Sequence, residues 1–332
     1  MSQSAKIVRF HERGGADVLR LEDLPLPEPG PGEVRLRVKA IGLNRAEVMF
    51  RNDQYMYTPK LPSKLGYEAS GIVEALGAGV DPGLLGKTMS TVPNFRADEY
   101  GVYGEVAIVP VSALAAYPAA LSFEEGTSIW MQYITAYGAL VHYGKVSKGD
   151  YVLLTAASSS VGIAAIDIAK AEGAITIAAT RTAKKKAELL ALGASHVIVT
   201  DEEDIAARVQ EITGGAGARI IFDAVAGPGI ETLADAAAPF ATIFIYGWLS
   251  GQVTPFPVIS SWTKALKVQG YTLLEITNDP KLLELATKYV FDKLTSNAFR
   301  PRIDRRFALA EIADAHRYME AGEHIGKIVV TV

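Results

Sequence analysis

The stretch YVLLTAASSSVG at residues 151–162 decides the fold of this chain. Its first four residues form a short, continuous apolar run, which is typical of a strand buried on both faces. Small residues follow and lead directly into an apolar, alanine-rich segment that has the length of a helix. The stretch therefore predicts a strand, a tight turn and a helix, the first unit of a parallel sheet.

The same alternation continues along the chain. Further apolar runs lie at 175–179, 197–199, 220–222 and 243–245, and segments of helix length separate them at 183–192, 203–212 and 229–237. Strands that alternate with helices favour a doubly wound α/β domain with a parallel sheet. We expect this domain to span residues 123–271.

The N-terminal third has a different pattern. Apolar residues at 34, 36, 38 and 40 alternate with charged ones, which predicts a strand with one face in water. Proline and glycine break up the segments 25–32 and 71–86. After residue 272, two helices and a closing strand return to this pattern. We therefore expect a β-rich domain formed by both chain ends, residues 1–122 and 272–332.

The amino-acid composition excludes several kinds of functional site and partner. The chain has no cysteine, which excludes disulfides, cysteine-ligated zinc, iron–sulfur clusters and a thiol nucleophile. Its net charge of −4 gives no electrostatic reason to expect a nucleic acid or an anionic membrane as partner. No apolar stretch approaches the roughly 20 residues of a spanning helix, and residues 1–9 do not read as a signal peptide. We expect a cytoplasmic protein that acts on a small molecule.

The turn after the first parallel strand has the chemistry of a dinucleotide site. Small residues there let the backbone and a helix N-terminus approach a pyrophosphate. Of the three usual glycines only Gly162 is present, with Ala156 and Ser159 in the other two places. A serine-rich turn can also simply cap a helix. The candidate cofactor-binding residues are Ser158, Ser159, Ser160, Val161 and Gly162.

The end of the next strand indicates which dinucleotide is bound. A site for NAD presents an acidic residue there, whereas a 2′-phosphate requires cations. Residues 179–186 read ATRTAKKK, without an acid. The guanidinium of Arg181 suits bidentate phosphate binding, and Lys185 adds a second charge. Since cations at a helix start oppose the helix dipole, an anion is favoured. With Thr180, these residues favour NADPH over NADH.

The chain resembles the medium-chain dehydrogenase/reductase superfamily and, within it, the zinc-independent quinone oxidoreductase branch. Ordered segments carry the resemblance: 32–34, 40–44, 65–73, 121–126, 135–137, 157–162, 222–223 and 326–329. It implies a GroES-like catalytic domain and a Rossmann domain, with the active site in the cleft. Family members are commonly dimers joined at the edge of the Rossmann sheet. Residues 256–271 are either such a surface or part of the core.

The resemblance also bears on metal binding. Zinc-dependent members place a cysteine near Asn44, a histidine at the position of Tyr67 and a further ligand near Gln132. Asparagine, tyrosine and glutamine are poor zinc ligands. The five histidines of this chain show no close ligand spacing. We therefore expect no metal.

Without a metal, the scaffold suits hydride transfer to a quinone or an α,β-unsaturated carbonyl, an apolar electrophile whose oxygen needs only a hydrogen-bond donor. The resemblance implies that Asn44 lies near the nicotinamide as a positioning and polarising residue; alternatively, its amide satisfies a turn. Met49 stands where the family has a tyrosine. Tyr55 and Tyr67 are our candidates for the missing donor, with Tyr57 as an alternative, and all three could instead wall an apolar pocket. Water is another source of the proton.

The resemblance implies further cofactor contacts. They are Thr135, Gly247, Trp248, Leu249 and Lys327. The alternatives are an ordinary helix hydroxyl for Thr135, core packing for Trp248 and a surface position for Lys327. Rival functions are an enoyl-thioester reductase, a 2-haloacrylate-type reductase and a non-catalytic NADPH-binding protein. A cation for an acidic substrate would have to come from Arg45, Arg51 or Lys60.

Overall fold

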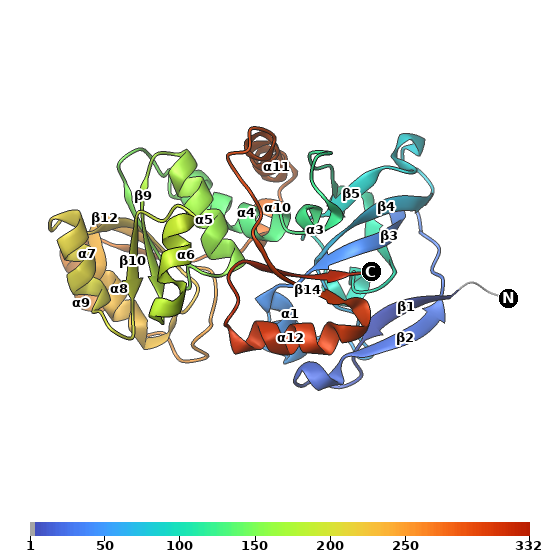
Figure 1. Ribbon diagram of the computed structural model, residues 1–332, viewed down its shortest axis with the longest axis horizontal. Coiled ribbons are helices and arrows are strands. Elements are labelled where there is room, and N and C mark those ends of the chain that lie inside the picture. Colours follow the sequence, from blue (N-terminus) through green and yellow to red (C-terminus); the bar gives the residue numbers. More distant parts are fainter. Residues whose placement is uncertain (1–3) are drawn as a thin grey trace. The chain divides into compact units, whose positions relative to one another are not determined.

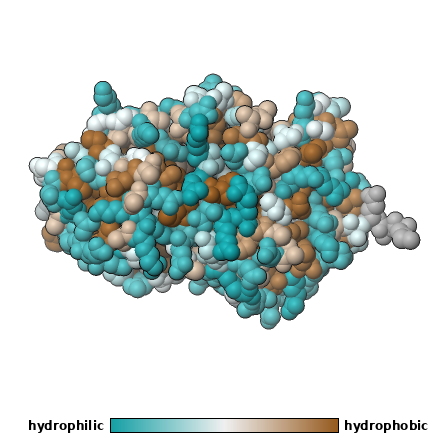
Figure 2. All heavy atoms as spheres, in the orientation of Figure 1, coloured by the Kyte–Doolittle hydropathy of each residue, from teal (hydrophilic) through white to brown (hydrophobic). Residues whose placement is uncertain are grey.

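The computed structural model describes residues 4–332, and the chain forms two compact units (Figure 1). The first unit contains the chain up to Met131 together with Pro301–Val332, and the second contains Gln132–Arg300. Within residues 4–332, no helix is both long enough and apolar enough to cross a bilayer. On the face drawn in Figure 2, hydrophobic residues are interspersed with hydrophilic ones, as is usual for protein surfaces.

A seven-stranded sheet forms the centre of the first unit. Its strands, in spatial order, are β14 (Ile303–Ala308), β15 (Lys327–Thr331), β3 (Glu33–Gly42), β4 (Glu68–Leu76), β5 (Thr88–Thr91) and β7 (Leu114–Ala115), with β6 (Val106–Pro110) paired to β3. The expected alternation in β3 is confirmed, because Val34, Leu36, Val38 and Ala40 are buried. Pairing of β15 with β3 brings the two chain ends into one β-rich unit, as the sequence predicted.

The remaining elements of the first unit lie around this sheet. They are β1 (Ser4–Arg9), β2 (Arg20–Pro25), α1 (Arg45–Arg51), α2 (Ala97–Tyr100), α3 (Phe123–Gly126) and α12 (Ile312–Ala321). Strands β1 and β2 form a separate antiparallel pair. Helix α1 begins directly after β3, which places Asn44 at the junction between strand and helix.

The second unit contains a six-stranded parallel sheet, which confirms the expected doubly wound domain. Its spatial order is β10 (His196–Val199), β9 (Ile175–Thr180), β8 (Tyr151–Leu154), β11 (Ala218–Asp223), β12 (Ala237–Ile245) and β13 (Lys267–Gly270). The chain proceeds outward from β8 in one direction and then returns to β11 on its other side. Ligands of open parallel sheets bind at the carboxyl ends of the strands at such a reversal.

Helices flank this sheet (Figure 1). They are α5 (Ser160–Ala171), α6 (Lys186–Ala191), α7 (Ile205–Thr213), α8 (Ile230–Ala236) and α9 (Val258–Lys264), followed by α10 (Leu274–Thr277) and α11 (Pro280–Thr295). Helix α4 (Trp130–Tyr137) contains the boundary between the units.

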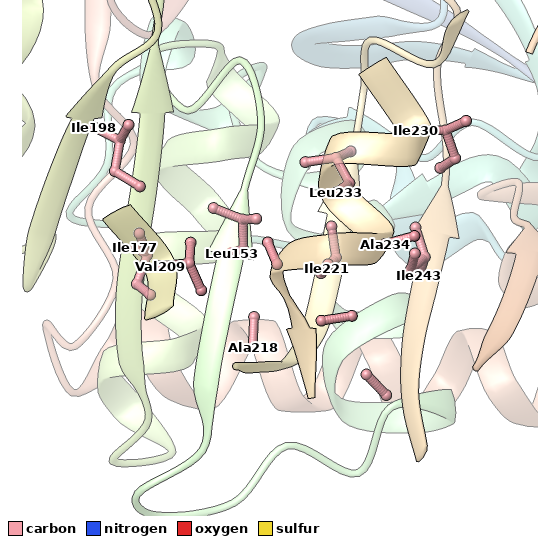
Figure 3. Packing of buried hydrophobic residues seen from close by; sticks show 13 residues of the cluster. Leu153, Ile177, Ile198, Val209, Ala218, Ile221, Ile230, Leu233, Ala234 and Ile243 are labelled. Carbon is pink, nitrogen blue, oxygen red and sulfur yellow. The ribbon is translucent and has the colours of Figure 1, made fainter. Parts of the chain in front are cut away.

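A cluster of buried aliphatic side chains joins the sheet to α7 and α8 (Figure 3). The strands contribute Leu153, Ile177, Ile198, Ile221 and Ile243, and the helices contribute Val209, Ile230, Leu233 and Ala234. Burial of each large aliphatic side chain stabilises the fold by about 1.5–3 kcal/mol. The apolar runs that predicted the strands therefore form the core that holds the strand ends in place.

The unit boundaries differ from the bounds expected from sequence. Helix α11 belongs to the second unit, because the ring of Tyr289 lies 5.0 Å from that of Tyr137 and its hydroxyl donates to Glu172 at 2.7 Å. Helix α3 belongs to the first unit, where the carbonyl of Phe123 accepts a hydrogen bond from Ser70. These long-range contacts decide to which unit each helix belongs. The periodicity of apolar residues along the chain gives no information about such contacts.

A buried carboxyl group, that of Asp167, forms hydrogen bonds with residues near both ends of the second unit. The Tyr133 hydroxyl, near its first residue, donates to Asp167 Oδ2 at 2.6 Å. The backbone of Arg300, its last residue, also donates to Asp167. The ring of Phe299 stacks on Tyr133 at 4.8 Å. Burial outweighs these hydrogen bonds and raises the pKa of Asp167 to about 6.

Replacing Tyr133 by phenylalanine should destabilise the protein more at pH 8 than at pH 5. Because the pKa of Asp167 is raised in the folded state, its ionisation costs stability as the pH rises from about 4 to about 6. Loss of the O–H donor should add about 1–3 kcal/mol to that cost once the carboxyl group is ionised. Calorimetric melting temperatures at the two pH values measure the difference.

Tyr289→Phe is the matched control, since it removes a hydrogen bond to Glu172, which is only half-buried. We expect a smaller loss in this control that does not change between pH 5 and pH 8. Equal losses at both pH values for Tyr133→Phe would contradict the role of the buried carboxylate.

Candidate active site

The turn after β8 brings backbone N–H groups to the start of α5. Its backbone reverses through Ala156, which has a φ of +45°, and Ala157 N–H donates to the carbonyl of Ala179 at 3.1 Å. Ser159 caps the helix, because its hydroxyl oxygen accepts from the N–H of Gly162 at 3.1 Å. The amides of the first two helical residues are left without an intrahelical acceptor. Such a helix start binds anions.

Only glycine fits at position 162. A Cβ atom there would lie 2.5 Å from the carbonyl oxygen of Ala157 and 2.6 Å from its Cα. Helix α5 consequently packs directly onto the turn, which is the role of the last glycine in a dinucleotide fingerprint. At Ala156 the missing glycine leaves an alanine in a left-handed conformation, at a cost of roughly 1–2 kcal/mol.

A buried aspartate holds together the carboxyl ends of the two strands at the reversal. Asp223 ends β11, and its Oδ1 accepts from the Thr155 hydroxyl at 2.6 Å and from Val225 N–H at 2.9 Å. Its Oδ2 accepts from Ala226 N–H at 2.9 Å. In turn, Thr155 Oγ1 accepts from Ala224 N–H at 2.9 Å. The sequence analysis assigned no role to Asp223. The signal that could have identified it is an acidic residue at the end of an apolar strand.

The segment after β12 continues this edge. Gly247 lies against the backbone of Ala224, whose carbonyl oxygen would be 2.7 Å from a Cβ at position 247. The same carbonyl accepts from Leu249 N–H at 3.1 Å. Trp248 is 42% exposed, so the core-packing alternative for this residue is wrong. Its indole N–H donates to the carbonyl of Gln252 at 2.6 Å.

The basic segment after β9 lies beside the serine turn. Thr180 is the buried last residue of β9, and Arg181 follows it with an exposed side chain. Within residues 4–332, Arg181 makes no ion pair. The ammonium of Lys185 donates to the Ser158 hydroxyl at 3.1 Å. The structure thus brings together the candidates of two separate sequence segments. Thr135 lies on α4 in the same unit.

In the first unit, Asn44 belongs to a buried group of polar side chains. The ammonium of Lys327 donates to Asn44 Oδ1 at 2.6 Å and forms an ion pair with Glu68. Lys327 is 1% exposed, so the alternative of a surface lysine is wrong. Glu68 neutralises its charge inside the first unit.

Two carboxyl groups, which sequence reasoning missed, complete this group. Glu68 Oε1 accepts from the backbone N–H of Met131 at 2.8 Å. Glu47 accepts from the backbone N–H groups of Asn44 and of Tyr67, the second at 3.3 Å. Burial raises the pKa of Glu47 to about 8, because desolvation outweighs the attraction of Lys327. The only sign of these two carboxyl groups in the sequence is that each is a single acidic residue within an apolar stretch.

The tyrosine candidates form an aromatic cluster. The hydroxyls of Tyr57 and Tyr67 are 2.6 Å apart, and Ala97 N–H donates to the Tyr57 oxygen at 2.8 Å. The ring of Tyr55 lies 5.7 Å from that of Tyr57 and 6.3 Å from that of Tyr67. Arg96 covers the Tyr57 ring at 4.0 Å. Burial raises the pKa of Tyr55 and that of Tyr67 far above the ordinary value, so both phenols stay protonated.

Arg51 is unavailable to an acidic substrate, contrary to the expectation from sequence. It is fully buried, its Nη2 donates to Glu320 at 2.7 Å and its Nε donates to the carbonyl of Gly14 at 2.7 Å. Its Nη1 donates to His316 Nδ1 at 2.9 Å. Burial and this arginine lower the pKa of His316 to about 3, so the ring is neutral. Arg45 and Lys60 are exposed.

The residues at this site do not fit a zinc ion. The chain has no cysteine, and its described part, residues 4–332, contains no group of three histidine, aspartate or glutamate side chains that could hold a metal. The carboxylate of Glu68 already neutralises the ammonium of Lys327. Asn44 and Tyr67, at two of the positions that hold ligands in zinc-dependent relatives, are poor donors for zinc.

Two protein-family models match the chain. The model described as "Alcohol dehydrogenase GroES-like domain" matches residues 30–119, within the first unit. The model described as "Zinc-binding dehydrogenase" matches residues 160–288, within the second unit. The matches therefore agree with a GroES-like part and a Rossmann part.

Curated relatives match over nearly the whole length. A quinone oxidoreductase from Pseudomonas aeruginosa is 32% identical over 328 residues, which cover 98% of this chain and 99% of that protein. A 2-haloacrylate reductase from Burkholderia sp is 28% identical over 327 residues, 97% of each chain. The similarity thus includes both units of the protein.

Solved structures agree with these relatives. A quinone oxidoreductase from Pseudomonas syringae pv. tomato superposes with a TM-score of 0.92 and 31% identity, covering 99% of this chain and 100% of that one. Escherichia coli quinone oxidoreductase complexed with NADPH gives a TM-score of 0.90 and 28% identity, covering 98% and 100%. The chain belongs to the medium-chain dehydrogenase/reductase superfamily, in its quinone oxidoreductase branch.

Proposed function

We propose that this protein is an NADPH-dependent, metal-independent oxidoreductase that reduces a quinone or an α,β-unsaturated carbonyl. The observation that carries the proposal is the anion-binding edge of the second unit, where the start of α5 lies beside Arg181 and Lys185. The quinone oxidoreductase of Escherichia coli, whose structure is similar, was solved with NADPH. The acceptor gains a hydride at carbon and a proton at oxygen; a quinone then becomes a hydroquinone when the carbon that received the hydride loses a proton and the second oxygen gains one.

The second unit supplies the cofactor contacts in this proposal. The N–H groups of Ser160 and Val161 and the nearby serine hydroxyls bind the pyrophosphate, and Gly162 permits its close approach. Arg181 and Lys185 bind the 2′-phosphate, the group that distinguishes NADPH from NADH. We assign the nicotinamide half to Thr135 and to residues 247–249. When bound, NADPH supplies the hydride.

The first unit supplies the contacts of the acceptor. Tyr55 and Tyr67 are the proposed hydrogen-bond donors to the acceptor oxygen, where negative charge develops as the hydride arrives. Their raised pKa values favour donation of a hydrogen bond over transfer of the proton itself. Water then delivers the proton. The apolar faces of the same rings, with Tyr57 and Phe95, suit a flat, apolar substrate.

The rival reductases need a cation at the substrate. A 2-haloacrylate or a large anionic thioester needs a cation at the substrate, and burial of Arg51 leaves only Arg45 and Lys60 among the expected candidates. A non-catalytic NADPH-binding protein would keep the cofactor site and reduce no acceptor.

We also propose a homodimer joined at the open edge of the parallel sheet. Strand β13 ends that sheet, and α9 precedes it. Within the stretch 256–271, Phe256, Ile259 and Trp262 are between 59% and 76% exposed, whereas Leu266 packs against the core of the sheet and Tyr271 is buried, so the stretch is part surface and part core. Exposed apolar residues next to the unpaired outer edge of a sheet favour an association surface. The proposal includes a cytoplasmic location, supported by the intracellular supply of NADPH, and no nucleic-acid partner.

Steady-state oxidation of NADPH should be fast with 1,4-benzoquinone or a simple enone and slow with crotonyl-thioester or 2-chloroacrylate. The reason is that the first two need only hydrogen-bond donors. Absorbance at the NADPH band measures all four. NADPH binding without reduction of any acceptor would overturn the enzymatic proposal, and a preference for chloroacrylate would favour the rival reductase.

Arg181→Ala should weaken NADPH binding by about 10- to 100-fold and leave NADH binding nearly unchanged. A charge-assisted hydrogen bond to phosphate is worth roughly 1.5–3 kcal/mol, and NADH lacks that phosphate. Titration of cofactor fluorescence measures both dissociation constants. Lys184→Ala is the control, because this neighbouring lysine is also exposed and should change neither constant much. Equal losses for NADPH and NADH would refute the 2′-phosphate assignment.

Trp262→Asp should convert the dimer to a monomer, because a desolvated charge opposes association at an apolar surface. Sedimentation velocity measures the change. Leu285→Asp, at an exposed apolar residue of α11, is the control and should remain dimeric. A monomeric wild-type protein would refute the proposed interface.

A further inference from the structure

The aromatic cluster of the first unit contains an arginine, Arg96, that the sequence analysis did not consider as a substrate contact. Its guanidinium carbon lies 4.0 Å from the centre of the Tyr57 ring. The next residue, Ala97, donates its backbone N–H to the Tyr57 oxygen at 2.8 Å. The ring of the preceding residue, Phe95, lies 5.9 Å from that of Tyr67. These three consecutive residues therefore form part of the cluster that we assign to the acceptor.

Asp98 holds this guanidinium in a bidentate ion pair. Arg96 Nε donates to Asp98 Oδ1 at 3.1 Å, and Arg96 Nη2 donates to Asp98 Oδ2 at 2.9 Å. The side chain of Asp98 is 1% exposed, whereas that of Arg96 is 40% exposed. Because a carboxylate shut away from water needs a charged or hydrogen-bonding partner, Asp98 keeps the arginine beside it. The two parallel hydrogen bonds also fix the plane of the guanidinium.

The acidic neighbours of Arg96 more than balance its charge. Asp98 neutralises the guanidinium, and a second carboxylate, that of Glu99, lies 3.9 Å from Arg96 Nε. One cation and two anions leave this part of the cluster with a net negative charge. An approaching carboxylate would be repelled by both acids and would find the bidentate edge of the guanidinium already used. A quinone or a simple enone carries no charge and meets no such repulsion.

The guanidinium nevertheless keeps the means to bind an anion. Among residues 4–332, Arg96 Nη1 has no hydrogen-bond partner. If residue 98 carried no charge, the arginine would present a positive charge and free N–H groups at the edge of the Tyr57 ring. The aromatic cluster thus does contain a cation, and the carboxylate of Asp98 is the group that makes this cation unavailable.

We propose that Asp98 is a specificity-determining residue, which restricts the acceptor to uncharged molecules by pairing with Arg96. This inference rests on the proposed function, because it takes the aromatic cluster as the site of the acceptor. It adds a physical reason for the low activity expected with 2-haloacrylates and anionic thioesters. Asp98 acts through Arg96, so it is a positioning residue.

Asp98→Asn should raise kcat/KM for 1,4-benzoquinone-2-carboxylate by about 10-fold relative to kcat/KM for 1,4-benzoquinone. The asparagine amide still accepts a hydrogen bond from Arg96 but no longer neutralises it, and a charge-assisted hydrogen bond to the substrate is worth about this factor. Steady-state oxidation of NADPH measures both acceptors. Because the ratio of the two is compared with the ratio in the wild type, the different intrinsic reactivities of the quinones cancel.

The gain should have two signatures of a freed charge. It should appear as a lower KM for the carboxylate with little change in its kcat, since the added interaction binds a group remote from the reacting atoms. It should also disappear in 1 M salt, where the Debye length falls to about 3 Å. A general loosening of the fold would produce neither signature.

Glu99→Gln is the matched control, because it removes one negative charge beside Arg96 but leaves the bidentate pair intact. The side chain of Glu99 is 51% exposed, so solvent screens its charge and the ratio should change by less than about 2-fold. Asp98→Ser removes the buried charge with a different side chain and should reproduce the gain. The double variant Arg96→Met with Asp98→Asn should return the ratio to the wild-type value, because the gain requires the guanidinium. Melting temperatures verify that each variant is folded.

A wild-type ratio in both Asp98→Asn and Asp98→Ser would overturn the inference, and so would a gain that persists in the double variant without Arg96. Either result leaves reduction of 1,4-benzoquinone, and with it the proposed function, intact. If the wild-type protein reduces neither quinone, the proposed function fails, and the inference that rests on it fails as well.

Discussion

A lysine ammonium shut away from water has to keep an anion beside it, and this constraint joins the two ends of the chain in the first unit. Lys327, at the start of β15, pairs with Glu68, at the start of β4, and donates to Asn44 before α1. Removing one partner of a buried pair typically costs about 3–5 kcal/mol. Gly42 has to remain small for the same reason. These residues therefore act as one group, and the amide of Asn44 depends on all of them.

The second unit also contains a buried charged group, the carboxylate of Asp223, which is stabilised by hydrogen bonds and not by an ion pair. Asp223 is buried at the end of β11 and accepts from a hydroxyl and two backbone N–H groups, which fixes the strand ends at the reversal of the sheet. In both units nearly every polar atom of the site has an internal partner. Within residues 4–332, the guanidinium of Arg181 forms no ion pair, and the first amides of α5 have no intrahelical acceptor. These are the groups to which we assign the phosphates of the proposed cofactor.

The sequence predicted those features that depend on residues close together in the chain, and it did not predict those that depend on contacts between distant residues. Apolar runs and small-residue turns are local, so the parallel strands, the cap at Ser159 and the basic segment after β9 were predictable. The partners of Arg51 and Lys327 were not, since Glu320 lies 269 residues from Arg51 and Glu68 lies 259 residues from Lys327. Helix α11 was assigned to the wrong unit because Tyr289 contacts Tyr137 and Glu172, which lie 152 and 117 residues before it in the sequence.

The sequence by itself determined the alternation of strands and helices, the family and the preference for a phosphate-bearing dinucleotide, because each of these depends on residue types in a fixed local order. Only the tertiary structure decided which charges are available to a ligand. Arg51 and Arg181 are the same residue type, yet one is buried against Glu320 and the other is exposed. The tertiary structure also decided the orientation of the Asn44 amide. Its charged neighbours, Lys327 and Glu68, come from distant parts of the chain.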